Sequence, residues 1–250
     1  MVKNVLKKGE GIIIRTTDYG ESNKILTVYT KEFGKIGMMA RGAKKPNSRL
    51  SSVSQLFTYG SFLYHSSRGL GTLSQGEAIH SFRAIREDLF KTAYAAYTVE
   101  LIDKLTEENV PNPSLFKLLY HTLYYINENY DMEVVTFIFE TKMLAVAGIA
   151  PYLDGCVNCK REEGPFAFSV REGGFLCQRC FYLDDNRIPL TEASQKLLRL
   201  FLHFNLKRLG TISLKEKTKQ EIKLILDKYY EAYSGLYIKS KRFLEQLDKL

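Results

Sequence analysis

The chain has 250 residues, of which 45% are hydrophobic and 26% charged, and its formal net charge is +8. This length can bury a sizeable core in one to three domains, and no run of roughly 18 apolar residues predicts a membrane span. The basic N-terminus is followed by only a three-residue isoleucine run, so a secretory signal is excluded and a cytoplasmic location is expected.

The excess positive charge lies in one third of the chain. Residues 1–83 contain 13 Lys/Arg and 5 Asp/Glu, an excess of 8, whereas the remaining residues are neutral in sum. Such an asymmetry is expected when one domain binds a polyanion. The alternative is a solvated surface whose charge only aids solubility.

The residues from 11 to 78 predict a small β-domain. Short segments rich in Ile, Val, Thr, Tyr and Phe alternate with glycine-containing turns. The expected strands are 12–16, 25–30, 36–41, 61–65 and 72–75. Because closure into a barrel removes the exposed edges of a five-stranded sheet, we expect an oligonucleotide-binding (OB) fold over residues 1–83.

After residue 83 the apolar residues recur at helical spacing. One helix is expected over 84–108, a second from Asn112-Pro113, and a third over 132–147. Thr191 is the expected N-cap of the next helix, and residues 213–216 have the form of a capping box that opens the last one.

The predicted class is therefore α+β. An OB-fold barrel is followed by a helical domain in two parts, which a loop-rich insertion separates. The expected ranges are 1–83 for the barrel, 84–150 and 190–250 for the helical domain, and 151–189 for the insertion.

The insertion holds all four cysteines as two Cys-x-x-Cys pairs, Cys156 with Cys159 and Cys177 with Cys180. Their separation of 17 residues is typical of a zinc ribbon or knuckle, in which each tight turn presents two thiolates to one ion. Glycines and a proline between the pairs favour a hairpin with strands near 166–170 and 175–176. Because four protein ligands leave no open coordination position, we expect one structural zinc ion that activates neither water nor a substrate.

Three other uses of these cysteines compete with zinc. Disulfides are disfavoured in a reducing compartment. A thioredoxin-like redox pair needs one Cys-x-x-Cys and leaves the second unexplained. Iron–sulfur clusters also take four thiolates, but their sequences usually have other spacings.

No catalytic motif is recognisable in the sequence. It lacks a phosphate-binding loop, a Gly-x-Ser-x-Gly elbow and the His-x-Glu of zinc deaminases, and its four histidines are scattered. We expect a protein that is not an enzyme. A metal-dependent nuclease would require an open site with clustered carboxylates.

A basic segment lies between the third and fourth expected strands. Residues 41–49 combine four cations with Gly, Pro, Ser and Asn, which suits contacts to phosphate oxygens and hence binding that ignores base sequence. The predicted DNA contacts are Arg41, Lys44, Lys45 and Arg49, together with Arg15 and Lys35. Lys239, Lys241 and Arg242 form a second basic cluster, for which a helix end with solvated cations is an equal alternative.

Aromatic residues of the β-domain offer faces on which unpaired bases can stack. Most are expected in the barrel core, which leaves one or two for DNA. The seven are Tyr19, Tyr29, Phe33, Phe57, Tyr59, Phe62 and Tyr64.

Several segments together resemble the RecO family of bacterial recombination mediators. They are the Gly-x-Ile-x-Arg of residues 11–15, Asp-Tyr-Gly-Glu-Ser at 18–22, residues 30–34, the basic segment 41–49, and residues 236–244. With the helical domain and the four-cysteine insertion, the resemblance spans essentially the whole chain.

The resemblance implies an OB-fold domain joined to a helical domain with a zinc module. It implies a non-enzymatic protein of the cytoplasm and nucleoid that binds single- and double-stranded DNA and anneals complementary strands. With RecR, and sometimes RecF, such proteins load RecA onto DNA coated by single-stranded-DNA-binding protein (SSB), whose acidic tail they contact. A zinc-stabilised adaptor for protein partners, with incidental charge, is the competing interpretation.

Overall fold

The computed structural model describes residues 5–67, 69–210 and 212–247. The chain divides into two compact units. The first consists of Met1–Asn129 and Ile238–Leu250, and the second of Tyr130–Tyr237. The predicted barrel lies within the first unit and the four cysteines within the second.

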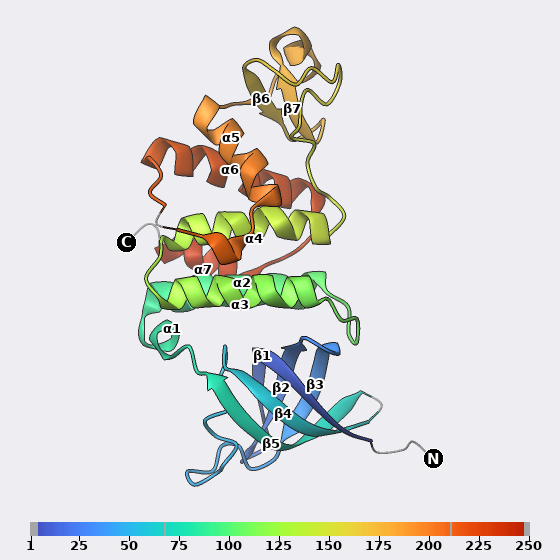
Figure 1. Cartoon of the computed structure of the whole chain (residues 1–250), viewed down its shortest axis with the longest axis vertical. Coiled ribbons are helices and arrows are strands. Elements are labelled where there is room, and N and C mark those ends of the chain that lie inside the picture. Colours follow the sequence, from blue (N-terminus) through green and yellow to red (C-terminus); the bar gives the residue numbers. More distant parts are fainter. Residues whose placement is uncertain (1–4, 68, 211, 248–250) are drawn as a thin grey trace. The chain divides into compact units, whose positions relative to one another are not determined.

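Five strands form a closed barrel in the first unit (Figure 1). They are β1 (Val5–Tyr19), β2 (Asn23–Thr30), β3 (Gly34–Ala40), β4 (Tyr59–Ser66) and β5 (Leu70–His80). Their order is β1-β2-β3-β5-β4, and only the β3–β5 pair is parallel. The predicted OB-fold is confirmed, with each strand longer than its alternating apolar segment because the ladder continues past the buried residues.

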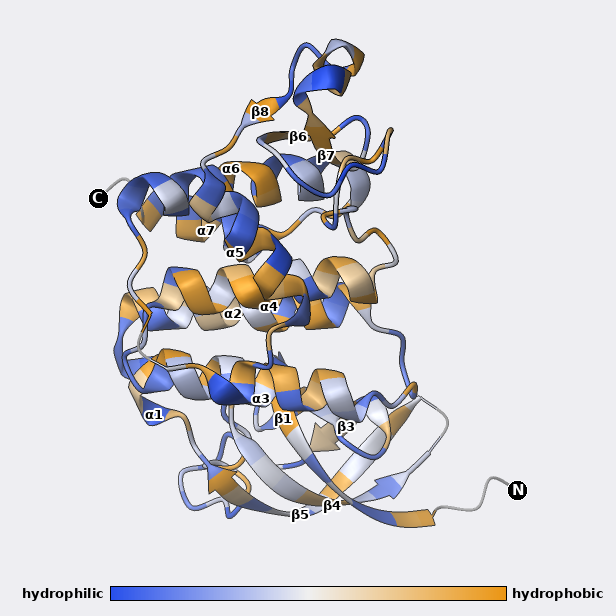
Figure 2. Ribbon diagram, turned by 45° about the horizontal axis from the view of Figure 1, so that its top comes forward, coloured by the Kyte–Doolittle hydropathy of each residue, from blue (hydrophilic) through white to orange (hydrophobic). Residues whose placement is uncertain are grey.

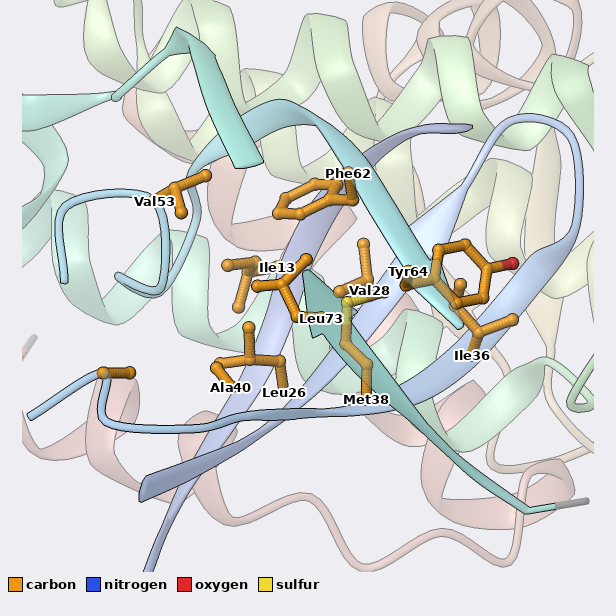
Figure 3. Close-up of a cluster of buried hydrophobic side chains, with 11 residues drawn as sticks. Ile13, Leu26, Val28, Ile36, Met38, Ala40, Val53, Phe62, Tyr64 and Leu73 are labelled. Atoms are coloured by element: carbon orange, nitrogen blue, oxygen red, sulfur yellow. The ribbon is translucent and has the colours of Figure 1, made fainter. Parts of the chain in front are cut away.

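The barrel encloses a single cluster of aliphatic and aromatic side chains (Figure 3). Ile13, Leu26 and Phe62, from three different strands, are fully buried in it. The β3–β4 connection adds Ala43 and Val53 to the same cluster, so this connection is part of the core as well as of the surface. Close packing of this kind holds the connection against the barrel.

Four helices complete the first unit. They are α1 (Arg83–Glu87), α2 (Leu89–Leu105), α3 (Pro113–Asn127) and α7 (Lys239–Leu247). The single helix predicted over 84–108 is wrong, because Asp88 is extended and its side chain accepts a hydrogen bond from the Lys91 N–H at 2.9 Å, which starts a new helix. The predicted start of α3 is confirmed, since the Asn112 side chain caps it at the Leu115 N–H, at 3.0 Å.

The C-terminal helix α7 packs against α2. The Glu100 carboxylate of α2 accepts hydrogen bonds from the Lys239 N–H at 3.1 Å, the Ser240 N–H at 2.8 Å and the Ser240 hydroxyl at 2.5 Å. A carboxylate at these unsatisfied N–H groups stabilises the start of a helix. Residues 238–250 therefore group with the barrel's unit, whereas the predicted domains assigned them to the second part of the helical domain.

The second unit combines three helices with a small sheet. The α-helices are α4 (Met132–Val146), α5 (Glu192–His203) and α6 (Glu216–Tyr233), with two short 3₁₀-helices, η1 (Gln178–Leu183) and η2 (Leu206–Arg208). The sheet has the order β7-β6-β8, from β6 (Phe166–Ser169), β7 (Gly174–Cys177) and β8 (Ile188–Pro189). Hydrophobic and hydrophilic residues alternate along α5 and α6 as in amphipathic helices (Figure 2).

The predicted helix starts in this unit have different outcomes. Thr191 caps α5 by accepting from the Ser194 N–H at 3.3 Å, as predicted. The predicted capping box at 213–216 is wrong, because Lys215 occupies the N-cap position of α6 and no side chain caps it. Among the described residues, no helix is both long and apolar enough to span a bilayer.

Candidate metal centre and nucleic-acid interface

The four cysteines meet at one point of the second unit. The Sγ atoms of Cys156, Cys159, Cys177 and Cys180 all lie within 4.8 Å of one another, and none forms a disulfide. Sulfurs at the corners of a tetrahedron around zinc, each about 2.3 Å from the ion, are about 3.8 Å apart. The observed cluster matches that arrangement within about 1 Å. Cys156, Cys177 and Cys180 are buried and Cys159 is exposed.

The first cysteine pair lies on a tight turn. The Lys160 N–H donates to the Cys156 carbonyl at 2.9 Å, and the Cys156 N–H donates to the Arg161 carbonyl at 2.8 Å. Lys160 adopts a left-handed conformation, with φ of 60°. Gly155 precedes the turn, where an added Cβ would lie 2.7 Å from the Arg161 carbonyl oxygen. The turn therefore presents both thiols on one side.

The second cysteine pair is carried by the end of β7 and by η1. Backbone hydrogen bonds connect it to the first turn, since the Val157 N–H donates to the Phe175 carbonyl at 2.7 Å. The Phe175 N–H in turn donates to the Tyr152 carbonyl at 3.1 Å. A Cβ on Gly174 would collide with the backbone of Tyr152, so glycine is required for the two segments to approach.

The electrostatics of the cluster favour a bound cation. Burial favours the neutral thiol of Cys156, but N–H groups of Cys159, Cys177 and Asn158 point at its sulfur and lower its pKa to about 6. The Asn158 amide donates to the Cys180 sulfur at 3.4 Å, yet burial and the neighbouring sulfurs raise the pKa of Cys180 to about 12. Four thiolates together require a cation to offset their repulsion, and a divalent ion that prefers sulfur fits this donor set.

Sequence reasoning missed Asn158 as a neighbour of the cluster. Its position between Cys156 and Cys159 is a usable signal, because an amide inside a Cys-x-x-Cys turn lies within reach of sulfurs on the opposite turn. We infer that it orients Cys180.

The basic connection between β3 and β4 is docked on the β1–β2 turn of the barrel. The Gly42 N–H donates to the Asn23 side-chain oxygen at 2.8 Å, and the Lys44 N–H donates to the Ser22 carbonyl at 2.9 Å. The Lys44 ammonium also pairs with the Asp18 carboxylate at 2.8 Å. With Ala43 buried in the core, these contacts hold residues 41–45 in a defined position.

All four predicted cations on this connection are exposed, and three of them have no ion-pair partner among the described residues. Arg41, Lys45 and Arg49 are exposed, and within the described part of the chain no carboxylate lies in ion-pair range of them. Lys44 is also exposed but shares its charge with Asp18. We call these four exposed residues of the β3–β4 connection the basic loop.

Lys35 does not belong to this surface, contrary to the prediction. It is 8% exposed, and its ammonium donates to the Asp103 carbonyl at 2.6 Å and pairs with the Asp103 carboxylate at 3.3 Å. A buried lysine that is held by the carbonyl and the carboxylate of Asp103 fixes β3 to α2 and is not exposed to contact DNA. We remove Lys35 from the proposed DNA contacts.

Arg15 and the C-terminal cations have intermediate positions. Arg15 is exposed, but its guanidinium donates to the Thr27 hydroxyl at 3.2 Å and lies 3.6 Å from the Asp103 carboxylate. On α7, Lys239 and Arg242 are exposed, whereas the Lys241 ammonium lies 5.7 Å from the centre of the Tyr97 ring. These four residues lie outside the basic loop and remain predictions.

The fold and the two sites define a class of protein, namely an OB-fold barrel with a basic loop joined to a helical unit with a four-cysteine module. The family model described as Recombination protein O N terminal matches residues 3–82, and the one described as Recombination protein O C terminal matches residues 86–242. The chain belongs to the RecO family.

Individual relatives agree with the family assignment over almost their whole length. The DNA repair protein RecO of Bacillus subtilis (strain 168) is 59% identical over 246 residues, which cover 98% of this chain and 96% of the relative. That of Bacillus cytotoxicus is 58% identical, covering 98% and 99%. That of Halalkalibacterium halodurans is 56% identical, covering 97% and 96%.

Proposed function

We propose that this chain is a non-enzymatic recombination mediator that binds single- and double-stranded DNA and anneals complementary strands. In this proposal it acts in the cytoplasm on the nucleoid, where with RecR and RecF it helps load RecA onto DNA coated by SSB, whose tail it contacts. Membership of the RecO family supports the role in DNA repair. The basic loop is the observation that carries the DNA-binding part.

The geometry of the basic loop fits phosphate contacts. Arg41, Lys45 and Arg49 project from a backbone that is held to the barrel core and to the β1–β2 turn. Cations on a fixed backbone bind a polyanion at a lower entropic cost than cations on a free loop. Because phosphates are identical along DNA, contacts of this type bind without regard to sequence.

Annealing follows from the same charge. Two complementary strands repel each other through their phosphates, and a positive surface that contacts both lowers this repulsion while leaving the bases free to pair. No bond is made or broken by the protein in this process.

We further propose that Cys156, Cys159, Cys177 and Cys180 hold one structural zinc ion. The sulfur distances and the burial of three of the four thiols support this ligand set. When bound, the ion cross-links the two turns of the module, and with four sulfur ligands it leaves no position for a substrate.

A salt titration tests the DNA-binding proposal. The double variant Lys45→Ala/Arg49→Ala removes two exposed cations of the basic loop, and Lys207→Ala/Arg208→Ala removes the same charge from η2 as a matched control. If both cations contact phosphates, the slope of log K against log salt falls by about 1.4 to 1.8 in magnitude and affinity drops similarly for unrelated sequences.

The control variant is expected to keep the slope of the unmodified protein. An unchanged slope in Lys45→Ala/Arg49→Ala rejects the basic loop as the DNA contact. If the unmodified protein does not bind DNA even at low salt, the proposal fails and the adaptor interpretation takes its place.

A further inference from the structure

We infer that Tyr19 is a base-stacking residue, which gives the basic-loop site a preference for unpaired bases over duplex DNA. This inference rests on the proposed function, because it needs a DNA backbone bound at the basic loop. It adds a residue that recognises bases to a site otherwise made of phosphate contacts.

The exposure of the barrel's aromatic rings singles out Tyr19. Four of the seven candidate rings are buried in the barrel or against it: Tyr29, Phe57, Phe62 and Tyr64. Tyr19 is 54% exposed, the most exposed of the seven. Within the described residues its ring has no aromatic neighbour and its hydroxyl has no hydrogen-bond partner.

The two remaining rings, those of Phe33 and Tyr59, already contact other side chains. The Phe33 ring lies 4.8 Å from the Lys7 ammonium and 6.3 Å from the Tyr64 ring. The Tyr59 ring packs edge-on against Tyr120 of α3 at 5.3 Å, and its hydroxyl donates to the Glu10 carboxylate at 2.7 Å. Both rings therefore already have cation or ring partners, whereas Tyr19 has neither among the described residues and is more exposed than both.

Tyr19 also lies beside the basic loop. It is the last residue of β1 and pairs across the β1–β2 ladder with Asn23, whose side chain accepts the hydrogen bond from Gly42. Its neighbour Asp18 pairs with Lys44. The residue that carries the ring is therefore connected on both sides to the loop that carries the cations.

The turn that follows Tyr19 has open space at Gly20. Gly20, which follows Tyr19, has a φ of 59°, and a Cβ built there would meet no atom within 4 Å. A nucleotide can therefore approach the turn without displacing protein atoms.

An aromatic face beside cations is the combination that binds single strands. In a duplex both faces of every base are covered by neighbouring bases, so a protein ring gains nothing from them. In a single strand the faces are accessible, and stacking one base on an aromatic residue changes affinity by roughly five- to a hundredfold. The consequence is that the ring contributes to single-strand binding only.

The acidic residues near Tyr19 do not prevent a DNA strand from binding at the turn. Asp18 and Glu21 are the acids near Tyr19 in sequence, and the charge of Asp18 is offset by Lys44. With Lys24, Arg41, Lys44, Lys45 and Arg49, the turn and the basic loop carry five cations against these two acids. The turn and the basic loop together therefore carry a net positive charge.

The test compares three ligands of equal length, namely oligo(dT), the same backbone with abasic spacers, and a duplex. For Tyr19→Ala we expect roughly tenfold weaker binding of oligo(dT), with the abasic strand and the duplex changed less than twofold. Tyr19→Phe should bind oligo(dT) like the unmodified protein. Tyr182→Ala removes another exposed tyrosine, from the second unit, and should change none of the three affinities.

A second measurement does not depend on loss of binding. The chain contains no tryptophan, so Tyr19→Trp introduces a single reporter. We expect its fluorescence to be quenched by oligo(dT) but not by the abasic strand, and that of Tyr182→Trp to be quenched by neither.

The outcomes separate this inference from the proposed function. If the unmodified protein binds oligo(dT) and the abasic strand equally and Tyr19→Trp is not quenched, the stacking role is wrong while phosphate binding stands. If the unmodified protein binds none of the three ligands, the proposed function itself fails.

Discussion

The barrel and the four-cysteine module are both small β structures, but different forces hold them together. The barrel closes its sheet and fills it with eleven buried side chains. The module has strands of only four, four and two residues, and its apolar core consists mainly of Phe166, Phe168, Phe175 and Leu176. The barrel can therefore be stable through burial alone, whereas the proposed zinc ion would cross-link a module that buries much less.

The way in which each structure is stabilised determines which of its residues can bind another molecule. Because the core stabilises the barrel, its turns and connections are free to carry exposed cations and an exposed ring. In the module three of the four cysteines are buried and their sulfur atoms face one another. Under the proposed function, the barrel binds DNA and the zinc ion stabilises the module.

Removal of the metal should have the largest effect and should be confined to the second unit. Cys177→Ser, or a strong chelator, is expected to reduce bound zinc from one per chain to none and to abolish amide protection in β6 and β7, since structural zinc contributes about 10–16 kcal/mol to such modules. Zinc content by mass spectrometry and hydrogen exchange are the measurements. Protection in β1 to β5 should persist.

Arg179→Ala is the matched control for that variant, because Arg179 lies between Cys177 and Cys180 but is exposed. It should retain the ion. If the chelator leaves β6 and β7 protected, the module does not depend on a metal and the contrast with the barrel is lost.

A cavity in the barrel core should destabilise the barrel and leave the four-cysteine module intact. Phe62 is fully buried, so Phe62→Ala is expected to lower the free energy of unfolding of the barrel by about 3–5 kcal/mol. Urea denaturation measures this loss, while zinc content should stay at one per chain. Leu63→Ala, at the next and only half-buried position of β4, should cost much less. Equal losses for both variants would contradict the register of β4.

The attachment of α7 should depend on pH. Burial raises the pKa of Glu100, but hydrogen bonds from the Ser240 hydroxyl and N–H and from the Lys239 N–H, together with the charge of Lys104, lower it further than burial raises it. A depressed pKa means that the contribution of Glu100 is complete above its usual pKa of 4.5 and is lost as pH falls through the lower folded-state value.

Hydrogen exchange of α7 between pH 3 and pH 7 measures this dependence. We expect Glu100→Gln to weaken the protection of α7 at pH 7 by about 1 kcal/mol and to remove most of its change below pH 4.5. Glu245→Gln, on the exposed side of the same helix, is the control. Unaltered protection in Glu100→Gln would show that packing on α2 alone holds α7.

The smallest expected effect concerns Asp18, which pairs with Lys44 and under the proposed function would compete with phosphate for it. Asp18→Asn removes the competing charge and should tighten single-stranded DNA binding by about two- to fivefold at low salt. Fluorescence anisotropy is the measurement. Glu87→Gln breaks a comparable exposed ion pair, with Arg83, and should leave the affinity unchanged. A weaker complex in Asp18→Asn would mean that the ion pair positions the loop for binding.

Features that depend on neighbouring residues in the chain were predictable. The five strands, the caps at Asn112 and Thr191 and the two cysteine pairs were all recognised, because a cap or a Cys-x-x-Cys turn is completed within four residues. The break at Asp88 was missed although the interaction is local. Helical spacing continues across it, and only the capping hydrogen bond to Lys91 distinguishes it.

From the sequence we could predict the barrel, the start of α3 and the four cysteines that lie together. Only the tertiary structure decided that Lys35 is buried on Asp103, that Asp18 holds Lys44, and that α7 returns to Glu100. Each of these contacts joins residues 26 to 140 positions apart, and no local pattern encodes which distant carboxylate a cation or helix end will meet. For the same reason a basic residue could be recognised in the sequence, but its availability to DNA could be judged only in the fold.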